Sequence, residues 1–163
     1  MKQKVSILFL GALVLGLTAL FSGCESDTLY SESEDLASAA WLSTDTFQVN
    51  FEVTETQRYH TVYLESRFTD VYPYSNIYYR VQLNGPGGQD ITEVKNFEVT
   101  DKTGKWLGSG FGDLHSYSFP IINDIEFKQK GKYKVKVIPF MRVDSLPGIH
   151  DRGIRVSLGK EVF

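Results

Sequence analysis

The sequence predicts an all-β protein, a single antiparallel β-sandwich of the jelly-roll or immunoglobulin-like kind. Three observations favour this fold. Apolar residues recur at every second position in several short runs, which is typical of strands with one buried face. Clusters of Gly, Pro and Asn separate some of these runs, and no segment after the amino-terminal apolar run has the spacing of an amphipathic helix. We therefore expect about eight strands and very little helix.

The first 23 residues of the 163-residue chain, residues 1–23, form a predicted export signal. Lys2 and Lys4 precede an apolar run over residues 5–21 that contains no charged side chain. This run is slightly short for a membrane-spanning helix, which needs about 20 apolar residues, and an acidic stretch follows it in place of a basic flank. These features favour cleavage of the segment over permanent insertion in a membrane.

Residues 20–24, Leu-Phe-Ser-Gly-Cys, resemble a bacterial lipobox, where the lipoprotein signal peptidase cuts after the cysteine thiol has been diacylated. Phe21 stands where Leu, Val or Ile is usual. Cys24 is the only cysteine in the chain, so it forms no intramolecular disulfide. The sequence therefore predicts lipidation of Cys24, with palmitate-type acyl chains that bind the lipid bilayer. An ordinary signal peptide with an incidental cysteine is the alternative.

Residues 24–40 are expected to form a flexible tether, because Ser, Glu, Asp and Ala dominate this segment and offer little apolar surface to bury. Residues 41–163 are expected to form the β-sandwich domain, beginning near Trp41. The export signal holds two lysines and no acids, so its removal changes the net charge of the chain from −3 to −5. This acidic balance argues against a nucleic-acid partner.

The expected strands follow one another with turns between them. The buried faces of the first three are expected to be Phe47, Val49, Phe51 and Val53; Val62, Leu64 and Phe68; and Ile77, Tyr79, Val81 and Leu83. Residues 84–88 are a predicted turn, since glycine permits positive φ and proline fixes its own φ. Phe97 and Val99 lead into a predicted hairpin at residues 101–107, with Gly104 in the left-handed conformation. Later strands are expected at residues 117–121, 133–140 and 154–158.

Five lysines occupy alternate positions over residues 128–136. In the strand part of this segment they project from one face, while Tyr133, Val135 and Val137 point inward. Two interpretations follow for such a row of lysines. It contacts an anionic partner such as lipopolysaccharide or an acidic protein, or it protects an exposed edge strand from pairing with another chain. We favour edge protection at this stage.

The densest aromatic cluster in a predicted loop is Tyr-Pro-Tyr-Ser-Asn at residues 72–76, with Arg67 shortly before it. Exposed aromatic residues on a connection between strands are typical of interaction sites. The alternative, which we favour, is that Pro73 shapes a turn while the tyrosine rings cover the end of the core with their hydroxyls in water. The candidate interaction residues are Arg67, Tyr72, Pro73, Tyr74, Asn76 and Trp106.

No recognisable catalytic constellation occurs in the sequence, so we expect no enzymatic activity, no cofactor and no metal site. Residues 108–112, Gly-Ser-Gly-Phe-Gly, lack the lysine and the following helix of a phosphate loop and are expected to form a flexible connection. His60, His115 and His150 lie in separate segments without a spacing that suits zinc. A hydrolase would need the fold to bring His115 or His150 against carboxylates and a nucleophile.

A set of residues and short motifs runs in order over nearly the whole of the chain that follows the export signal. They are the lipobox ending at Cys24, Trp41, Arg67, residues 72–76, residues 101–110, Met141 and Arg142, residues 146–149 and residues 151–155. In this combination they resemble the gliding-motility lipoprotein GldH family of Bacteroidetes.

The resemblance implies a membrane-anchored, non-enzymatic lipoprotein of the gliding motility or type IX secretion-linked machinery. It also implies protein partners in the cell envelope and a lipid-anchored location at the outer membrane. The residues themselves leave a second interpretation open, a surface glycan-binding lipoprotein, because Tyr and Trp rings on the loops of a sandwich can stack against sugar rings.

Overall fold

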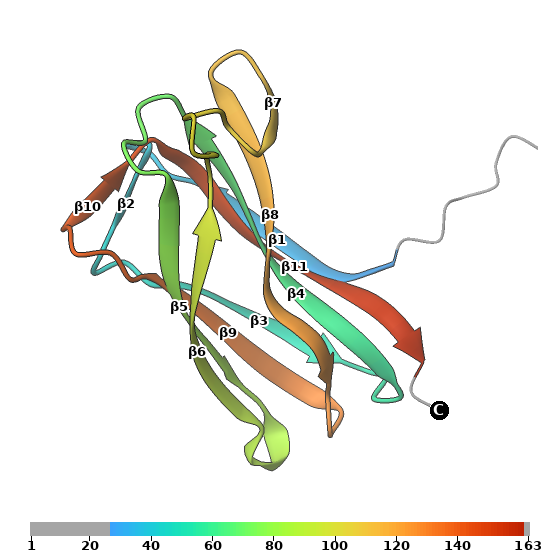
Figure 1. Ribbon diagram of the computed structural model, residues 1–163. Helices are drawn as coiled ribbons and strands as arrows, with labels where there is room; N and C mark the ends of the chain where they lie inside the picture. The colour runs from blue at the N-terminus through green and yellow to red at the C-terminus, as the bar shows by residue number, and fades with distance from the viewer. Residues whose placement is uncertain (1–26, 162–163) are drawn as a thin grey trace, which may run out of the picture.

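The computed structural model describes residues 27–161, which form two antiparallel β-sheets packed face to face and a small ribbon at one end (Figure 1). The five-stranded sheet consists, in spatial order, of β1 (Thr28–Asp35), β11 (Ile149–Glu161), β4 (Arg58–Thr69), β8 (Leu114–Glu126) and β7 (Ser109–Phe111). The four-stranded sheet consists of β3 (Phe47–Val53), β9 (Gly131–Pro139), β5 (Asn76–Asn84) and β6 (Asp90–Glu98). The ribbon pairs β2 (Ala40–Leu42) with β10 (Ser145–Pro147). The predicted all-β sandwich is confirmed.

Helix is nearly absent from the described residues, as expected. One turn of 3₁₀ helix at Pro86–Gly88 lies within the predicted turn between β5 and β6. Gly87 and Gly88 there have φ of +70° and +73°, a conformation that glycine adopts without strain. Among residues 27–161 we find no helix with the length and apolar character needed to cross a membrane.

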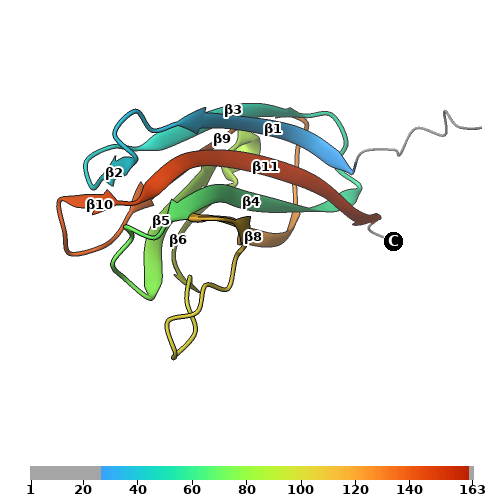
Figure 2. The ribbon, with the colours of Figure 1, turned by 90° about the horizontal axis from the view of Figure 1, so that it is seen from above.

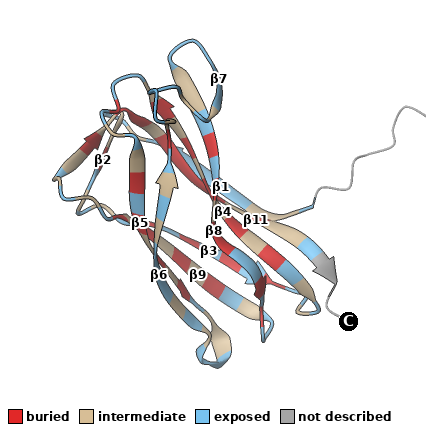
Figure 3. Cartoon of the chain, in the orientation of Figure 1, coloured by how far each residue is buried: buried red, intermediate tan, exposed pale blue. Residues whose placement is uncertain are grey.

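The core lies between the two sheets and is filled mainly by buried residues of β3, β4, β5, β8, β9 and β11, visible as red bands in Figure 3. The buried faces predicted for β3, β4 and β5 are confirmed. Trp41, on β2, is completely buried and packs against Phe47 and Tyr79, with ring centroids 6.5 Å and 5.6 Å away. Burial of such large aromatic side chains is the main source of stability in a domain without disulfides.

The prediction of a flexible tether over residues 24–40 is wrong for residues 28–35, which form β1. This strand pairs with β11 over seven positions, from Thr28 opposite Ser157 to Asp35 opposite Asp151. One of the acidic residues that suggested disorder instead contacts the neighbouring strand: Glu34 Oε1 accepts a hydrogen bond of 2.7 Å from Nε of the buried Arg152. The domain therefore begins at residue 28. The export signal, residues 1–23, and Cys24 lie outside the described residues.

Other strands are longer or more numerous than the alternating pattern indicated. The glycine-rich residues expected to form a flexible connection contain β7, which forms a hairpin with β8 by pairing Ser109 with Ser116. Gly112, with φ of +68°, makes the turn of this hairpin. The predicted turn at residues 101–107 is confirmed, with Gly104 at φ of +85° and a single bridge between Thr100 and Trp106.

The lysine-bearing strand β9 lies in the middle of its sheet, paired with β3 on one side and β5 on the other. Edge protection was therefore the wrong interpretation of the lysine row. The buried residues of β9 are Tyr133, Val135, Val137 and Pro139, so the lysines between them project from the outer face of the four-stranded sheet.

Candidate interaction site

Four of the six predicted interaction residues meet around one open hollow of about 450 Å³, which we call the aromatic hollow. It lies at the end of the sandwich that carries β7 and the ribbon, where the β4–β5 loop approaches the turn at residues 101–105 (Figure 1). The residues that line it are Asp70, Tyr72, Pro73, Tyr74, Ser75, Thr100, Gly104 and Trp106. The fold thus brings Trp106 to a loop that lies about thirty residues earlier in the sequence.

Tyr72 is part of the core as well as of the hollow. Only 5% of its surface is exposed, and its ring packs edge-on against Phe68 with centroids 4.9 Å apart. Its hydroxyl donates a hydrogen bond of 2.8 Å to the carbonyl oxygen of Asn76, which closes the loop, and burial raises the pKa of the hydroxyl well above its usual value. The buried ring of Tyr72 agrees with the interpretation that the tyrosines cover the core, whereas its hydroxyl bonds the backbone instead of water as expected.

The backbone of Tyr72 lies so close to a neighbouring segment of the chain that this segment must have a glycine at the point of contact. Gly148 has φ of +80°, and a Cβ atom built on it would lie 2.4 Å from the Tyr72 backbone nitrogen. No other residue type fits so close an approach, so Gly148 allows the β4–β5 loop to pack against the chain just before β11.

Tyr74 and Pro73 are the more accessible members of the loop. Pro73 is exposed, and Tyr74 is half-buried with its ring edge-on to Tyr72 at a centroid distance of 5.6 Å. A half-buried tyrosine held by another ring presents a rigid aromatic surface at low entropic cost, which suits binding.

Trp106 is held in place by a stack and a turn. Its ring lies parallel to that of His115, with centroids 4.3 Å apart, and His115 Nε2 lies 2.9 Å from Asp70 Oδ1. In the preceding turn, Oδ1 of Asp101 accepts bonds from the Thr103 hydroxyl and from the backbone nitrogens of Thr103 and Lys105. These hydrogen bonds lower the pKa of Asp101.

Arg67 and Asn76, the other two predicted interaction residues, do not line the hollow. The Arg67 side chain forms an ion pair with the mostly buried Asp151, whose Oδ1 also accepts a 3.0 Å bond from the Arg67 backbone nitrogen. Asn76 begins β5, and its Nδ2 donates a 2.9 Å hydrogen bond to Oδ1 of Asn96 on β6. Both side chains therefore join neighbouring strands.

Asp35, His150 and Asp151 come together beside Arg67, with one potential ligand atom from each lying within 4.8 Å of the others. Such a group has the donor types of a metal site. The Arg67 guanidinium, however, bonds to Asp151 and lies 3.5 Å from Asp35 Oδ1, so a cation there would compete with a fixed positive charge. We interpret the cluster as an ion-pair network that joins β1, β4 and β11.

Two histidines thus lie against carboxylates, as a hydrolase would require: His115 against Asp70, and His150 against Asp151 at 3.4 Å. Catalysis by such a pair also needs a nucleophile within hydrogen-bond reach of the histidine. Among residues 27–161, no hydroxyl group hydrogen-bonds either imidazole.

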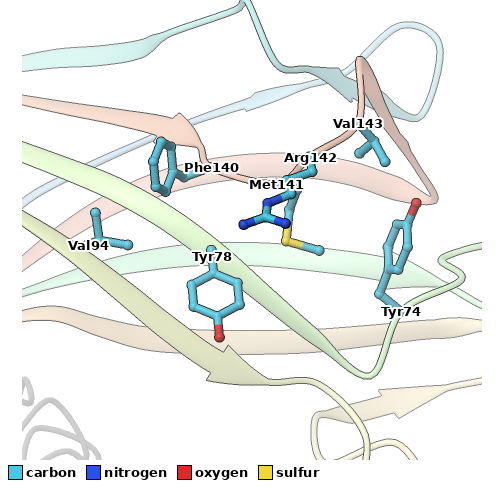
Figure 4. A pocket seen from close by; sticks show the side chains of 7 residues that line it. All are labelled: Tyr74, Tyr78, Val94, Phe140, Met141, Arg142 and Val143. Atoms are coloured by element: carbon cyan, nitrogen blue, oxygen red, sulfur yellow. The ribbon is translucent and has the colours of Figure 1, made fainter.

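Sequence reasoning missed a second hollow, of about 530 Å³, which we call the apolar hollow (Figure 4). It is lined by Tyr74, Tyr78, Val94, Phe140, Met141, Arg142 and Val143. Nearly half of the Val94 and Phe140 surfaces is exposed, and the Arg80 guanidinium lies 4.2 Å from the Phe140 ring centroid. Tyr74 lines both hollows, so they adjoin at this residue.

A family model described as GldH lipoprotein matches residues 28–156. The chain belongs to the GldH lipoprotein family. The region that matches the GldH model begins at the first residue of β1 and ends within β11, so it covers both sheets of the sandwich. This agrees with the observed start of the domain at residue 28.

Two curated relatives carry the GldH name. The chain is 27% identical to the gliding motility lipoprotein GldH homolog of Christiangramia forsetii, covering 85% of this chain and 88% of the relative. It is 26% identical to the gliding motility lipoprotein GldH of Flavobacterium johnsoniae, covering 90% of this chain and 94% of the relative.

Solved structures resemble this GldH family member only weakly. The VP2 subviral particle of infectious bursal disease virus gives a TM-score of 0.35 at 16% identity, covering 81% of this chain and 31% of that one. Dimeric latent PorU from Porphyromonas gingivalis gives a TM-score of 0.32 at 14% identity, covering 84% of this chain and 14% of that one. This chain spans less than a third of either structure, and TM-scores this low carry no functional information.

Proposed function

We propose that this chain is a lipid-anchored, non-enzymatic protein of the outer membrane that binds envelope proteins of the gliding motility or type IX secretion-linked machinery. The observation that carries the proposal is the GldH family match across the whole sandwich, together with two relatives named as gliding motility lipoproteins. The family assigns the process, and the surface of the domain supplies candidate contact sites.

The anchor in this proposal is the Cys24 thiol. Acylated and cleaved, Cys24 becomes the first residue of the mature chain, and each buried acyl methylene contributes about 0.8 kcal/mol to membrane binding. Several acyl chains of ordinary length therefore make the attachment practically permanent. The protein then stays at one membrane, so it can bind only partners that reach that membrane.

The contact surface in this proposal is the aromatic hollow, which offers Tyr74 and Trp106. Rigid aromatic rings around an open depression are typical of the residues that dominate binding energy at protein interfaces. In this proposal the two histidine–carboxylate pairs have structural roles and no catalytic one, because His115 stacks on Trp106 and Asp151 forms an ion pair with Arg67.

Complementation of a deletion strain tests the proposal. We expect the intact gene to restore spreading and secretion, and expect Cys24→Ser and the double variant Tyr74→Ala/Trp106→Ala to restore them poorly. Tyr59→Ala serves as a matched control, because Tyr59 is also a partly exposed tyrosine but lines neither hollow. Normal spreading and secretion in the deletion strain, with no envelope protein recovered by crosslinking, would overturn the proposal.

Glycan binding is a second candidate, favoured by the position of Tyr74 and Trp106 on the same open hollow. Aromatic rings of this kind stack against the apolar faces of sugars. A glycan array probed with the intact chain and with Trp106→Ala decides the question. We expect any stacking-dependent signal to fall in the variant, and an unchanged signal would exclude stacking by this ring.

A further inference from the structure

The outer face of the four-stranded sheet carries a row of cations with few acids beside them. Lys132, Lys134 and Lys136 project from this face of the central strand β9. Their neighbours in register are mostly uncharged amides: Gln48 and Gln82 beside Lys136, and Asn50 and Asn84 beside Lys134. Amide neighbours leave the positive charge of the lysines uncompensated.

Three carboxylates share this face. Glu52 lies opposite Lys132, Asp90 accepts a 2.8 Å hydrogen bond from the amide of Asn84, and Glu98 lies opposite Asn76. Within the part of the chain that the structure describes, no carboxylate forms an ion pair with Lys132, Lys134 or Lys136. Lys134 and Lys136 therefore form a locally cationic stripe on a chain whose net charge is −3.

Apolar groups continue the same face beyond the lysines. Arg80 lies opposite Ile138 on β9 and Val94 on β6, which places all three on the outer side of the sheet. Tyr78, two residues before Arg80, and Phe140 then border the apolar hollow (Figure 4). Cationic groups beside exposed tyrosine and aliphatic side chains are typical of surfaces that meet lipid headgroups.

The start of the folded domain restricts where this face lies. Three residues separate Cys24 from Thr28, and the four chain steps from one Cα atom to the other span no more than about 14 Å when fully extended. β1 runs beside β3 along one edge of the sandwich (Figure 2). Near its start, Tyr30 lines an open hollow together with Asn50, Glu52 and Lys132 of the outer face.

We infer that the outer face of the β3-β9-β5-β6 sheet lies against the anionic lipid surface of the membrane that holds the Cys24 acyl chains. The inference rests on the proposed acylation of Cys24. The lysine row supplies attraction to anionic headgroups, the apolar hollow meets the interface, and the short connection keeps both within reach. Lipid contact in this way fixes the orientation of the sandwich and directs the aromatic hollow away from the anchored end.

Lysine labelling on vesicles tests the inference with the unaltered protein. The acylated full-length product, its lipid verified by intact mass, is placed in vesicles of phosphatidylcholine alone or with added phosphatidylglycerol. An amine-reactive acetylating reagent then modifies each lysine, and peptide mass spectrometry gives the rates. Lys102 and Lys105 are internal controls, because they are exposed on the turn beside the aromatic hollow.

We expect labelling of Lys132, Lys134 and Lys136 to slow by about tenfold on the anionic vesicles, and to recover at high salt, because salt screens attraction to headgroups. Lys102 and Lys105 should react at the same rate on both kinds of vesicle. If the protein is acylated but the three face lysines and the two control lysines all show the same labelling rates on both kinds of vesicle, this inference alone is overturned. If Lys134 crosslinks to an envelope protein and its labelling does not depend on the lipid, the inference is overturned, and the occupant of this face is an acidic protein. A mature chain without lipid would overturn the proposed anchoring itself.

Discussion

Tyr72 and Tyr74 are neighbours in the aromatic hollow but differ in what they contribute to folding. Tyr72 is buried against Phe68 and bonds the Asn76 carbonyl, whereas Tyr74 is half-buried. We expect Tyr72→Phe to lower the free energy of unfolding by about 1 kcal/mol through the lost hydrogen bond. Tyr72→Ala should lower it by about 3–5 kcal/mol, and Tyr74→Ala by much less. Urea denaturation measures all three. Equal losses for both alanine variants would contradict a binding role for Tyr74.

His60 should make stability depend on pH. Its side chain is buried beside Phe127, and burial lowers its pKa below the usual 6.5. Backbone groups of Arg58 and Ile125 offset part of this effect, although among the described residues neither ring nitrogen has a hydrogen-bond partner of good geometry.

Because the folded state accepts this proton less readily than the unfolded state, stability should be lost as the pH falls below about 6.5. We expect His60→Phe, which keeps an aromatic ring beside Phe127, to flatten the decline between pH 7 and pH 5.5. Thermal unfolding across that range measures it. A decline of the same steepness in the variant would show that another group is responsible.

At the scale of elements, β1 depends on a close approach that only glycine allows. A Cβ atom on Gly153 of β11 would lie 2.9 Å from the Glu32 carbonyl oxygen and from the Ser33 Cβ. We expect Gly153→Ala to separate β1 from β11 and to cost about 1–3 kcal/mol. Hydrogen exchange should then quicken in β1 while the β4–β8 pairing stays protected. Ser31→Ala, on the exposed side of β1, is the control, and equal exchange in both variants would contradict this account of the edge strand.

Strands were predictable where one face is buried and the other is wet. β3, β5 and β9 have alternate buried residues, so periodicity located them well. β1, β6 and β7 contain no fully buried residue, so they left no such pattern and were missed or shortened. These strands form by hydrogen bonding to a neighbour already in place, which is a tertiary effect.

The candidate site shows the same limit. A local cluster of aromatic residues revealed Tyr72, Pro73 and Tyr74, because loop aromatics are visible in one segment. The ion pair of Arg67 with Asp151 could not be predicted, since Asp151 lies 84 positions away in the sequence. The apolar hollow was missed because it combines outer-face residues of β5 and β6 with residues after β9, and only the fold brings them together.

At the scale of the whole molecule, the two ends of the sandwich have different proposed roles. β1 starts within four residues of Cys24, while the aromatic hollow lies at the other end of the strand (Figure 1). The proposed anchor at one end and the exposed aromatic groups at the other suit a protein that holds a partner close to a membrane. The proposed acylation of Cys24 connects these features, and without it the orientation has no cause.

Metabolic labelling with a fatty-acid analogue, followed by membrane fractionation and intact-mass analysis of the mature protein, tests this central claim most directly. We predict that the labelled chain begins at Cys24, carries the analogue and stays with the membrane fraction, and that Cys24→Ser takes up no label and leaves that fraction. An unlabelled wild-type chain, or a Cys24→Ser variant that is labelled equally well, would contradict the account.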